Sequence, residues 1–337
     1  MNRVLITGGA GYIGSHTAKR LAAAGFEPVV LDDLSTGHAE AVRWGPFVQA
    51  DLADPGAVRD ALQKHGISAV VHFAACAYVG ESMLNPRKYF RNNVVNTLNL
   101  LDAMLDCGVQ TIVFSSTCAT YGLPRRLPIT EAHPQRPANP YGESKLFVER
   151  VLRWYGEIHG LHWFALRYFN AAGADPDGEI GEEHSPEPHL VPRAIQAALG
   201  RGPEIQVYGQ DYPTPDGTAI RDYVHVCDLA DAHLLALHYL SGGGASGACN
   251  LGTGQGHSVT EVILTVEQAT GRKVPRLNAE RRAGDPPALV AGTAKARRLL
   301  GWQPRFPDLR PIIETAVNWE MSRSSDARLP RPRVSSD

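Results

Sequence analysis

The feature that most constrains the fold is a glycine-rich turn near the N-terminus. The apolar run Arg3 to Thr7 leads directly into the glycine-rich segment 8–14, and a stretch of helical composition follows from Tyr12 to Ala24. Glycine is needed where a turn takes unusual dihedral angles and where the backbone approaches a pyrophosphate, which the free N–H groups of the next helix can bind. The order strand, turn, helix therefore predicts a dinucleotide-binding unit with its pyrophosphate turn at Gly8, Gly11 and Gly14.

Two carboxylates refine that prediction. Asp32 closes the next apolar run, Glu27 to Leu31, and lies 18 residues after Gly14. A carboxylate at this spacing accepts a hydrogen bond from a ribose 2′-hydroxyl and repels a 2′-phosphate, so NAD is favoured over NADP. Asp51 follows the third apolar run and is expected at the adenine end.

Strand and helix patterns alternate along the first half of the chain. Strands are expected at 27–31, 47–50, 69–73, 111–115 and 162–167, and helices at 56–65, 86–105 and 141–155. This alternation predicts the α/β class, as a Rossmann-type doubly wound parallel sheet over residues 1–170 with segments near 220–240 returning to it. The chain then becomes rich in Gly, Pro and acidic residues, which predicts a smaller mixed C-terminal substrate domain over 171–321. Residues 322–337, rich in Arg, Ser and Pro, are expected to be disordered.

Composition excludes several function classes. Among 337 residues, Lys+Arg 33 balance Asp+Glu 35, so there is no basic footprint for nucleic acid. The sequence has no apolar stretch long enough to span a membrane and no secretory signal pattern, and its five cysteines form no CxxC pair. We therefore expect reduced thiols in a cytoplasmic protein without membrane or nucleic-acid partners.

A histidine- and glutamate-rich segment raises the question of a metal site. His184 and His189 lie among Glu182, Glu183 and Glu187. Their spacing matches no helical ligand pair and prolines interrupt it, so a solvated loop without metal is expected.

A tyrosine and a lysine carry the proton-transfer chemistry. Tyr141 and Lys145 are four residues apart and share a helix face. A nearby ammonium favours the phenolate, which brings a tyrosine into the working range of a base. Ser115, Ser116 and Thr117 end the fifth strand at the sheet edge where α/β ligands bind, so a hydroxyl there can hydrogen-bond the substrate oxygen.

Five motifs in order carry a resemblance to a known family. TGGAGYIGSHT, FSSTCATYG, YGESK, RYFNAAGA and RDYVHVCDLADAH resemble the extended short-chain dehydrogenase/reductase superfamily and, within it, the UDP-glucose 4-epimerases. The likeness runs from Arg3 to about Trp319. It implies an enzyme in which tightly held NAD oxidises C4 of a UDP-hexose and returns the hydride to the opposite face of the rotated 4-keto sugar. Homodimerisation through the helices near 86–105 and 141–157 is a further implication.

The resemblance assigns catalytic and cofactor positions. Tyr141 corresponds to the base, Lys145 to the lysine that lowers its pKa, and Thr117 to a catalytic serine; all three also contact the cofactor, and Thr117 and Tyr141 contact the substrate. Ala77 stands where some members have a lysine, so one cofactor contact is expected to be missing. The remaining implied cofactor contacts are Tyr12, Ile13, Asp32, Asp33, Leu34, Ser35, Thr36, Gly37, Asp51, Leu52, Phe73, Ala74, Ala75, Asn92 and Phe169.

The same resemblance assigns the substrate side. Arg221 and Arg282 correspond to arginines of the diphosphate, a role that suits the bidentate guanidinium. Leu289 corresponds to a residue that gates the sugar pocket, and its intermediate size implies a preference for UDP-galactose and UDP-glucose over N-acetylated sugars. The remaining implied substrate contacts are Asn170, His189, Leu190, Gln206, Val207, Tyr208 and Asp285.

Other activities stay open at this point. A UDP-N-acetylglucosamine or UDP-xylose/UDP-arabinose 4-epimerase would share the same catalytic residues. A related dehydratase carries an Asp-Glu pair where this chain has Cys118 and Ala119. A non-catalytic NAD-sensing regulator would be expected to lack Tyr141 or Lys145, and both are present.

Overall fold

A computed structural model, which describes residues 3–282 and 284–326, contains a seven-stranded parallel sheet. Its strands lie in the order β11-β6-β5-β4-β1-β2-β3. The strand bounds are β1 (Arg3–Thr7), β2 (Glu27–Asp32), β3 (Phe47–Gln49), β4 (Ala69–His72), β5 (Thr111–Thr117), β6 (His162–Tyr168) and β11 (Gly247–Leu251). The predicted doubly wound sheet is confirmed, and β11 adds an edge strand that the sequence did not predict.

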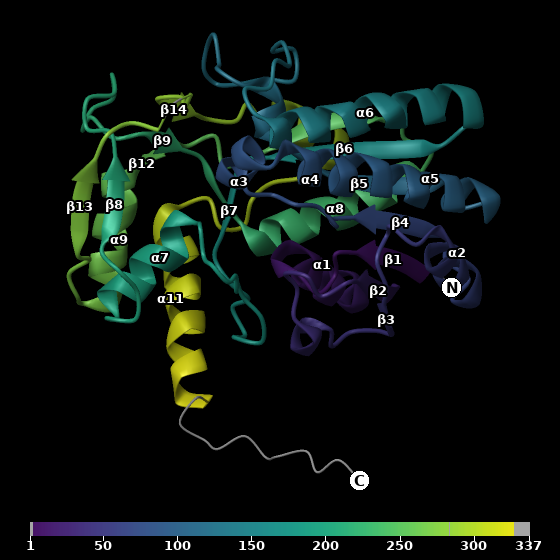
Figure 1. The fold of residues 1–337 in the computed structure, drawn as a ribbon, viewed down its shortest axis with the longest axis horizontal. Helices are drawn as coiled ribbons and strands as arrows, with labels where there is room; N and C mark the ends of the chain where they lie inside the picture. Colours follow the sequence, from purple (N-terminus) through teal and green to yellow (C-terminus); the bar gives the residue numbers. More distant parts are fainter. Residues whose placement is uncertain (1–2, 283, 327–337) are drawn as a thin grey trace.

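Helices cover both faces of this sheet (Figure 1). On one face, apolar residues of α1 (Tyr12–Ala23), α8 (Val226–Ser241) and α10 (Ala294–Leu300) pack on the strands. On the other face, α2 (Pro55–Lys64), α5 (Asn96–Asp106) and α6 (Pro140–His159) bury a second cluster. Strands buried on both faces are apolar throughout, which is why runs such as 69–73 lack polar alternation.

The helix expected at 86–105 is interrupted. It consists of α4 (Pro86–Phe90), a π-helical turn η2 (Arg91–Val95) and α5. A short helix, α3 (Val79–Leu84), precedes it, and the 3₁₀ turns η1 (Ala39–Ala41) and η3 (Cys118–Tyr121) complete this half. Such π turns occur frequently at functional sites, and this one carries Asn92 and Asn93.

The C-terminal part has its own apolar cluster, built from α7 (Leu190–Ala198), α9 (Val259–Thr270) and α11 (Leu309–Asp326). It lies beside the large sheet, at the left of Figure 1. Three small sheets accompany these helices and mix parallel with antiparallel pairs, which confirms a mixed C-terminal architecture. They pair β8 (Ile205–Tyr208) with β13 (Arg276–Ala279), β7 (Asn170–Ala172) with β10 (Tyr223–His225), and β9 (Ile220–Arg221) with β12 (His257–Ser258) and β14 (Ala288–Leu289).

The C-terminal tail and the cysteines test two further expectations. Because α11 continues to Asp326, the expected disorder is wrong for residues 322–326; residues 327–337 lie outside the described residues. All five cysteines lie in the described ranges and are free thiols, as expected. No described helix is both long enough and apolar enough to cross a membrane.

The sheet topology fixes where a ligand can bind. β1 lies between β2 and β4. The strands that follow β1 are added first on one side of it, as β2 and β3, and then on the other side, beginning with β4. The loops after β1 and β4 therefore diverge at the carboxyl end of β1, which is where ligands bind in such sheets. The loops after β1 and β4 touch there, because a Cβ placed on Gly8 would lie 2.6 Å from the backbone nitrogen of Ala74.

Candidate active site

A cavity of about 1280 Å³ opens at the carboxyl ends of the sheet strands and extends to the C-terminal part. The structure brings the predicted site residues together along its wall, with three exceptions: Leu34, Gly37 and Val207. Val207 points into the core because side chains alternate along β8, where Gln206 and Tyr208 face the cavity instead. Gly37 packs against Ala10. Leu34 lies in the turn that follows β2 and takes a positive φ of 60°.

The glycine turn leaves no room for side chains. A Cβ on Gly14 would lie 2.3 Å from the carbonyl oxygen of Gly8, which itself has a φ of 70°. Within the described residues, no side chain caps α1 and no acidic residue occupies its first turn. The helix therefore presents free N–H groups and its positive dipole end to the cavity, an arrangement that fits a bound pyrophosphate.

Asp32 shapes the turn as well as lining the cavity. Its carboxylate accepts hydrogen bonds from the backbone N–H groups of Ala10 at 3.0 Å and Leu34 at 2.8 Å. Burial raises the pKa of Asp32, while these two hydrogen bonds oppose the rise. Each carboxylate oxygen retains acceptor capacity, so the residue can bind a ribose hydroxyl as well.

Helix α6 begins so that Tyr141 and Lys145 face the cavity. The Asn139 side chain caps the helix by accepting from the N–H of Gly142 at 2.8 Å, and Pro140 fills the first helical position. Both Tyr141 and Lys145 are buried, and the Lys145 ammonium donates to the carbonyl oxygen of Ser115 at 2.9 Å.

The protein groups around Tyr141 do not by themselves lower its pKa into the working range of a base. Burial raises the pKa of Tyr141 well above its usual value, although a hydrogen bond with Thr117 opposes the rise. Burial likewise lowers the pKa of Lys145 to about 7. The expected lowering of the Tyr141 pKa by Lys145 is not what the structure shows, because desolvation dominates for both groups.

The substrate side carries the predicted arginines. Arg221 pairs with Asp285 and also donates to the carbonyl oxygen of Pro286 at 3.0 Å. The Arg282 guanidinium lies 3.9 Å from the ring centroid of Tyr208. All of these side chains except Pro286 were predicted to contact the substrate, and all line the cavity.

The segment 182–189 differs from its prediction. Ser185, Pro186, Pro188 and His189 are exposed, as a solvated loop requires, but Glu182 is buried. His184 and His189 line the cavity and pair with Glu182 and Glu187. Residues from distant parts of the sequence surround the segment, so the spacing of its residues could not predict that it lines the cavity.

The fold and geometry can now be compared with known proteins. The model of the NAD dependent epimerase/dehydratase family matches residues 4–252. The chain belongs to this family.

Several relatives of this family member are UDP-glucose 4-epimerases. It is 52% identical to a UDP-glucose 4-epimerase of Lacticaseibacillus casei over 94% of this chain and 96% of that protein. A UDP-glucose 4-epimerase structure from Brucella ovis in complex with NAD has a TM-score of 0.92 and 55% identity, covering 94% of this chain and 98% of that one. One from Bifidobacterium longum in complex with NAD⁺ and UDP has a TM-score of 0.90 and 37% identity, covering 96% and 99%. The resemblance seen in the sequence is confirmed.

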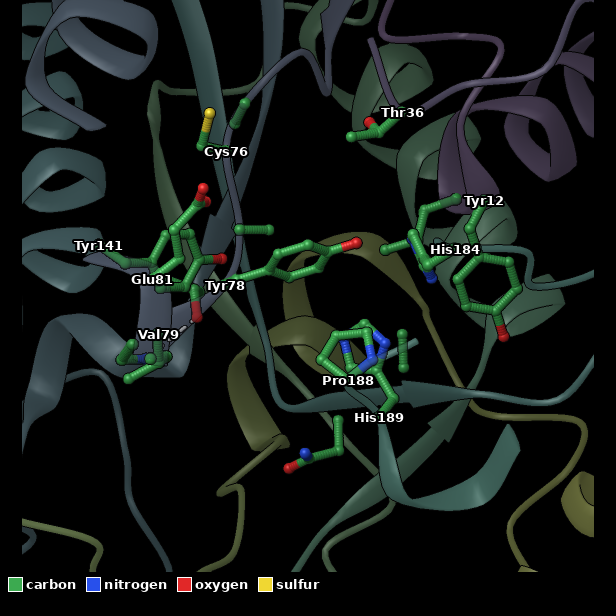
Figure 2. A pocket seen from close by; sticks show the side chains of 18 of the residues that line it. Tyr12, Thr36, Cys76, Tyr78, Val79, Glu81, Tyr141, His184, Pro188 and His189 are labelled. Atoms are coloured by element: carbon green, nitrogen blue, oxygen red, sulfur yellow. Dashed lines mark hydrogen bonds between the residues drawn. The ribbon is translucent and has the colours of Figure 1, made fainter. Parts of the chain in front are cut away.

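Sequence reasoning missed part of the wall in this family member. Tyr78 and Glu81 line the cavity beyond the predicted Ala77, and Tyr168 does so from the end of β6. Figure 2 shows Tyr78 reaching across the cavity, with Tyr141 on one side and His184, Pro188 and His189 on the other. The Tyr89 hydroxyl fixes this loop by donating to the carbonyl oxygen of Tyr78 at 2.6 Å. The only sequence signal for the loop that carries Tyr78 was its position directly after the central strand β4.

Proposed function

We propose that this chain is an NAD-dependent epimerase that interconverts UDP-galactose and UDP-glucose at C4 of the sugar. One observation carries the proposal: the buried pair Tyr141 and Lys145 lies in the same cavity as the glycine turn and the two arginines, Arg221 and Arg282. The names of the relatives, at about 50% identity over nearly the whole chain, support it.

The residues of this chain divide the work. Residues 1–170, with the returning segment near 220–240, hold the cofactor, and residues 171–321 hold the nucleotide sugar. NAD, when bound, would supply the hydride acceptor and a positively charged ring. Tyr141 takes the proton of the sugar 4-hydroxyl, and Thr117 hydrogen-bonds the same oxygen. The charges of the bound cofactor and of Lys145 together offset the desolvation that opposes the Tyr141 phenolate.

The cofactor side has a structural basis. Gly8, Gly11 and Gly14 give the pyrophosphate access to the α1 N-terminus, and Asp32 receives the adenosine ribose. Because Ala77 has no charged side chain, the cofactor is held without the lysine that some members carry at this position.

Product analysis tests the function. The purified protein is expected to contain NAD without any being added, and to convert UDP-galactose to UDP-glucose without net consumption of NAD. A turnover that consumes NAD stoichiometrically would instead establish a dehydrogenase.

The sugar preference follows from Leu289, which lines the cavity. A leucine leaves less room than a small residue for an N-acetyl group, so UDP-galactose and UDP-glucose are the preferred pair. Assays on UDP-galactose, UDP-GalNAc and UDP-arabinose measure this directly, and equal turnover of UDP-GalNAc and UDP-galactose would contradict it.

The enzyme acts as a homodimer in the cytoplasm. α3 and α4 pack beside α6, and these neighbouring helices expose large apolar side chains, the most exposed being Leu84 at 88%. Trp154 and Ile158 of α6 are each more than half exposed. Such a face favours a second copy of this chain, and sedimentation of the Trp154→Glu variant as a monomer beside a dimeric wild type tests it.

A further inference from the structure

Four side chains between β7 and α7 form a compact cluster at the cavity wall. The His189 Nδ1 lies 2.8 Å from Glu182 Oε1 and 2.9 Å from Glu187 Oε1. The His184 Nδ1 lies 3.4 Å from Glu182 Oε1 and 3.3 Å from Glu187 Oε2. Both carboxylates are shielded from solvent, whereas the His189 side chain is 43% exposed. We name Glu182, His184, Glu187 and His189 the His–Glu cluster.

The proton positions in the His–Glu cluster follow from its contacts. A carboxylate only accepts hydrogen bonds, so each Nδ1 that faces Glu182 and Glu187 carries a hydrogen. Burial lowers the pKa of His189, but the two carboxylates outweigh it and raise the pKa to about 10. The same balance raises the pKa of His184 to about 9. At neutral pH both rings are therefore cationic, each Nε2 also carries a hydrogen, and the two carboxylates compensate the charge.

Other elements packed against the cluster do not reverse this balance. Tyr78 contacts both rings edge-on, at centroid distances of 5.9 and 6.1 Å. Tyr12 of α1 is neutral, since burial and the charge of Glu182 raise its pKa well above the usual value. Further neighbours include Glu320 and Arg323 of α11, which lie on the far side toward Glu183 and Glu187, and Arg193, which follows His189 in α7. His38 also lies on that side, with Nε2 at 3.3 Å from the Glu183 carbonyl oxygen, and Trp319 donates to the Glu182 carbonyl oxygen at 3.2 Å.

The open side of the cluster faces the cavity. Among the described residues, neither histidine Nε2 has a hydrogen-bond partner, and both rings line the cavity that also contains Arg221 and Arg282. An Nε2–H of an imidazolium is a charge-assisted donor, which suits a phosphate oxygen better than a neutral amide does.

We propose that the His–Glu cluster is a proton-holding anion subsite, in which Glu182 and Glu187 keep both imidazoles protonated so that His189, supported by His184, donates to the diphosphate of the nucleotide sugar. This inference rests on the proposed function for the identity of its ligand. Glu182, His184 and Glu187 act here as positioning residues, because they reach the diphosphate only through His189.

A metal ion is the competing occupant of the same four side chains, whose ligand atoms lie within 4.8 Å of one another. Tetrahedral zinc ligands stand roughly 3.3 Å apart, given metal–ligand bonds near 2.1 Å, and the metal requires unprotonated nitrogen. The contacts of 2.8 and 2.9 Å at His189 are hydrogen-bond distances, which favours the proton.

Calorimetric titration with UDP tests the subsite on the NAD-containing protein between pH 7.0 and 9.5. At pH 7.0 the His189→Gln variant is expected to bind UDP about 10-fold or more weakly than the wild type, since a charge-assisted hydrogen bond is lost. Its KM for UDP-galactose should rise by a similar factor, with kcat changed much less. His162→Gln, on an exposed histidine at the start of β6, is the matched control and should bind as the wild type does.

The pH profile separates this role from a purely structural one. Wild-type affinity should fall between pH 8 and 9.5 more than the affinity of His189→Gln, a comparison that cancels the titration of uracil itself. Glu187→Gln removes one of the two charges that hold the protons, so the fall should begin at a lower pH in that variant. Identical profiles in the wild type, Glu187→Gln and His189→Gln would overturn the proposal, as would stoichiometric Zn²⁺ binding that is lost in His184→Gln.

The outcomes also separate this inference from the proposed function. A wild type that binds UDP with the expected pH profile, yet does not convert UDP-galactose, would refute only the epimerase activity. Normal epimerisation with unchanged KM in His189→Gln would refute only the subsite. Circular dichroism and NAD content of each variant establish that it is folded.

Discussion

The buried ion pair between Glu149 and Arg167 gives the sharpest test of how the catalytic helix is held. Arg167 of β6 donates to the Glu149 carboxylate of α6 through Nε at 2.9 Å and Nη2 at 2.5 Å. The Ser116 hydroxyl of β5 donates to the same carboxylate at 2.5 Å. The two charged side chains are only 5% and 9% exposed, so neither can recover its hydration if the other is removed.

Glu149→Ala is expected to cost about 3–5 kcal/mol of unfolding free energy, because it leaves the Arg167 guanidinium buried without its counter-charge. In a chain of this size the loss corresponds to a fall in melting temperature of about 4–7 °C. Turnover should fall as well, since Ser116 precedes Thr117 and α6 carries Tyr141 and Lys145. Urea unfolding followed by fluorescence, with parallel UDP-galactose assays, measures both effects.

Two control variants test whether the loss of stability comes from the unpaired buried charge. Glu157→Ala removes a partner of the exposed Arg153, at 3.6 Å, and should change stability by less than about 0.5 kcal/mol. The apolar double variant Glu149→Leu/Arg167→Met should regain most of the stability lost in Glu149→Ala, because no buried charge remains. A loss below about 1 kcal/mol in Glu149→Ala, or a double variant no better than the single one, would refute the reasoning.

The remaining predictions address the cofactor, the base, the sugar and the His–Glu cluster. Gly14→Ala should lose copurified NAD, because its Cβ would lie 2.3 Å from the Gly8 carbonyl oxygen; the 260 nm absorbance of the purified protein measures this, and retained NAD would contradict it. Tyr141→Phe should keep NAD and lose at least about 100-fold in turnover, the range typical of an absent general base. Leu289→Ala should raise UDP-GalNAc turnover relative to UDP-galactose by about 10-fold, as expected for space gained in an apolar pocket. Because the pKa values of His184 and His189 are raised, their stabilising contribution is complete below about pH 6.5 and is lost as pH rises through 9–10; the urea midpoint of the wild type should therefore drop more over that range than that of His184→Gln/His189→Gln.

The large sheet could be predicted because its signals are local. Every strand except β11 is a short apolar run, and the predicted helices on its faces have a periodic apolar pattern between turn residues. The glycine turn and Asp32 lie within one βαβ unit, so their spacing in sequence directly reflects their spacing in space. Most of the predicted cofactor residues that depend on this unit line the cavity, whereas Leu34 and Gly37 do not.

The C-terminal part could not be predicted in the same way, because its order comes from pairings between distant segments. Strands such as β9 and β14 contain two residues each and leave no periodic pattern. Tyr78 from another segment packs against both histidines of the His–Glu cluster, which sequence spacing does not reveal. The pairing of Asp285 with Arg221 likewise joins β9 to the loop before β14. Resemblance supplied His189, Arg221 and Asp285 but not Glu182, His184 or Glu187, and the burial and contacts of all six had to come from the structure.

The buried pair Tyr141 and Lys145 shows how one base can serve both halves of an epimerisation. Burial raises the pKa of Tyr141 and lowers that of Lys145 to about 7, so the chain alone keeps Tyr141 protonated. Tyr141 can give up this proton only when further positive charge enters its low-dielectric surroundings, where charge acts strongly. Its affinity for the proton should therefore be low while the cofactor is oxidised and high while it is reduced. Tyr141 would then take a proton from the 4-hydroxyl in the first half and return it in the second, which is what a reaction without net redox change requires.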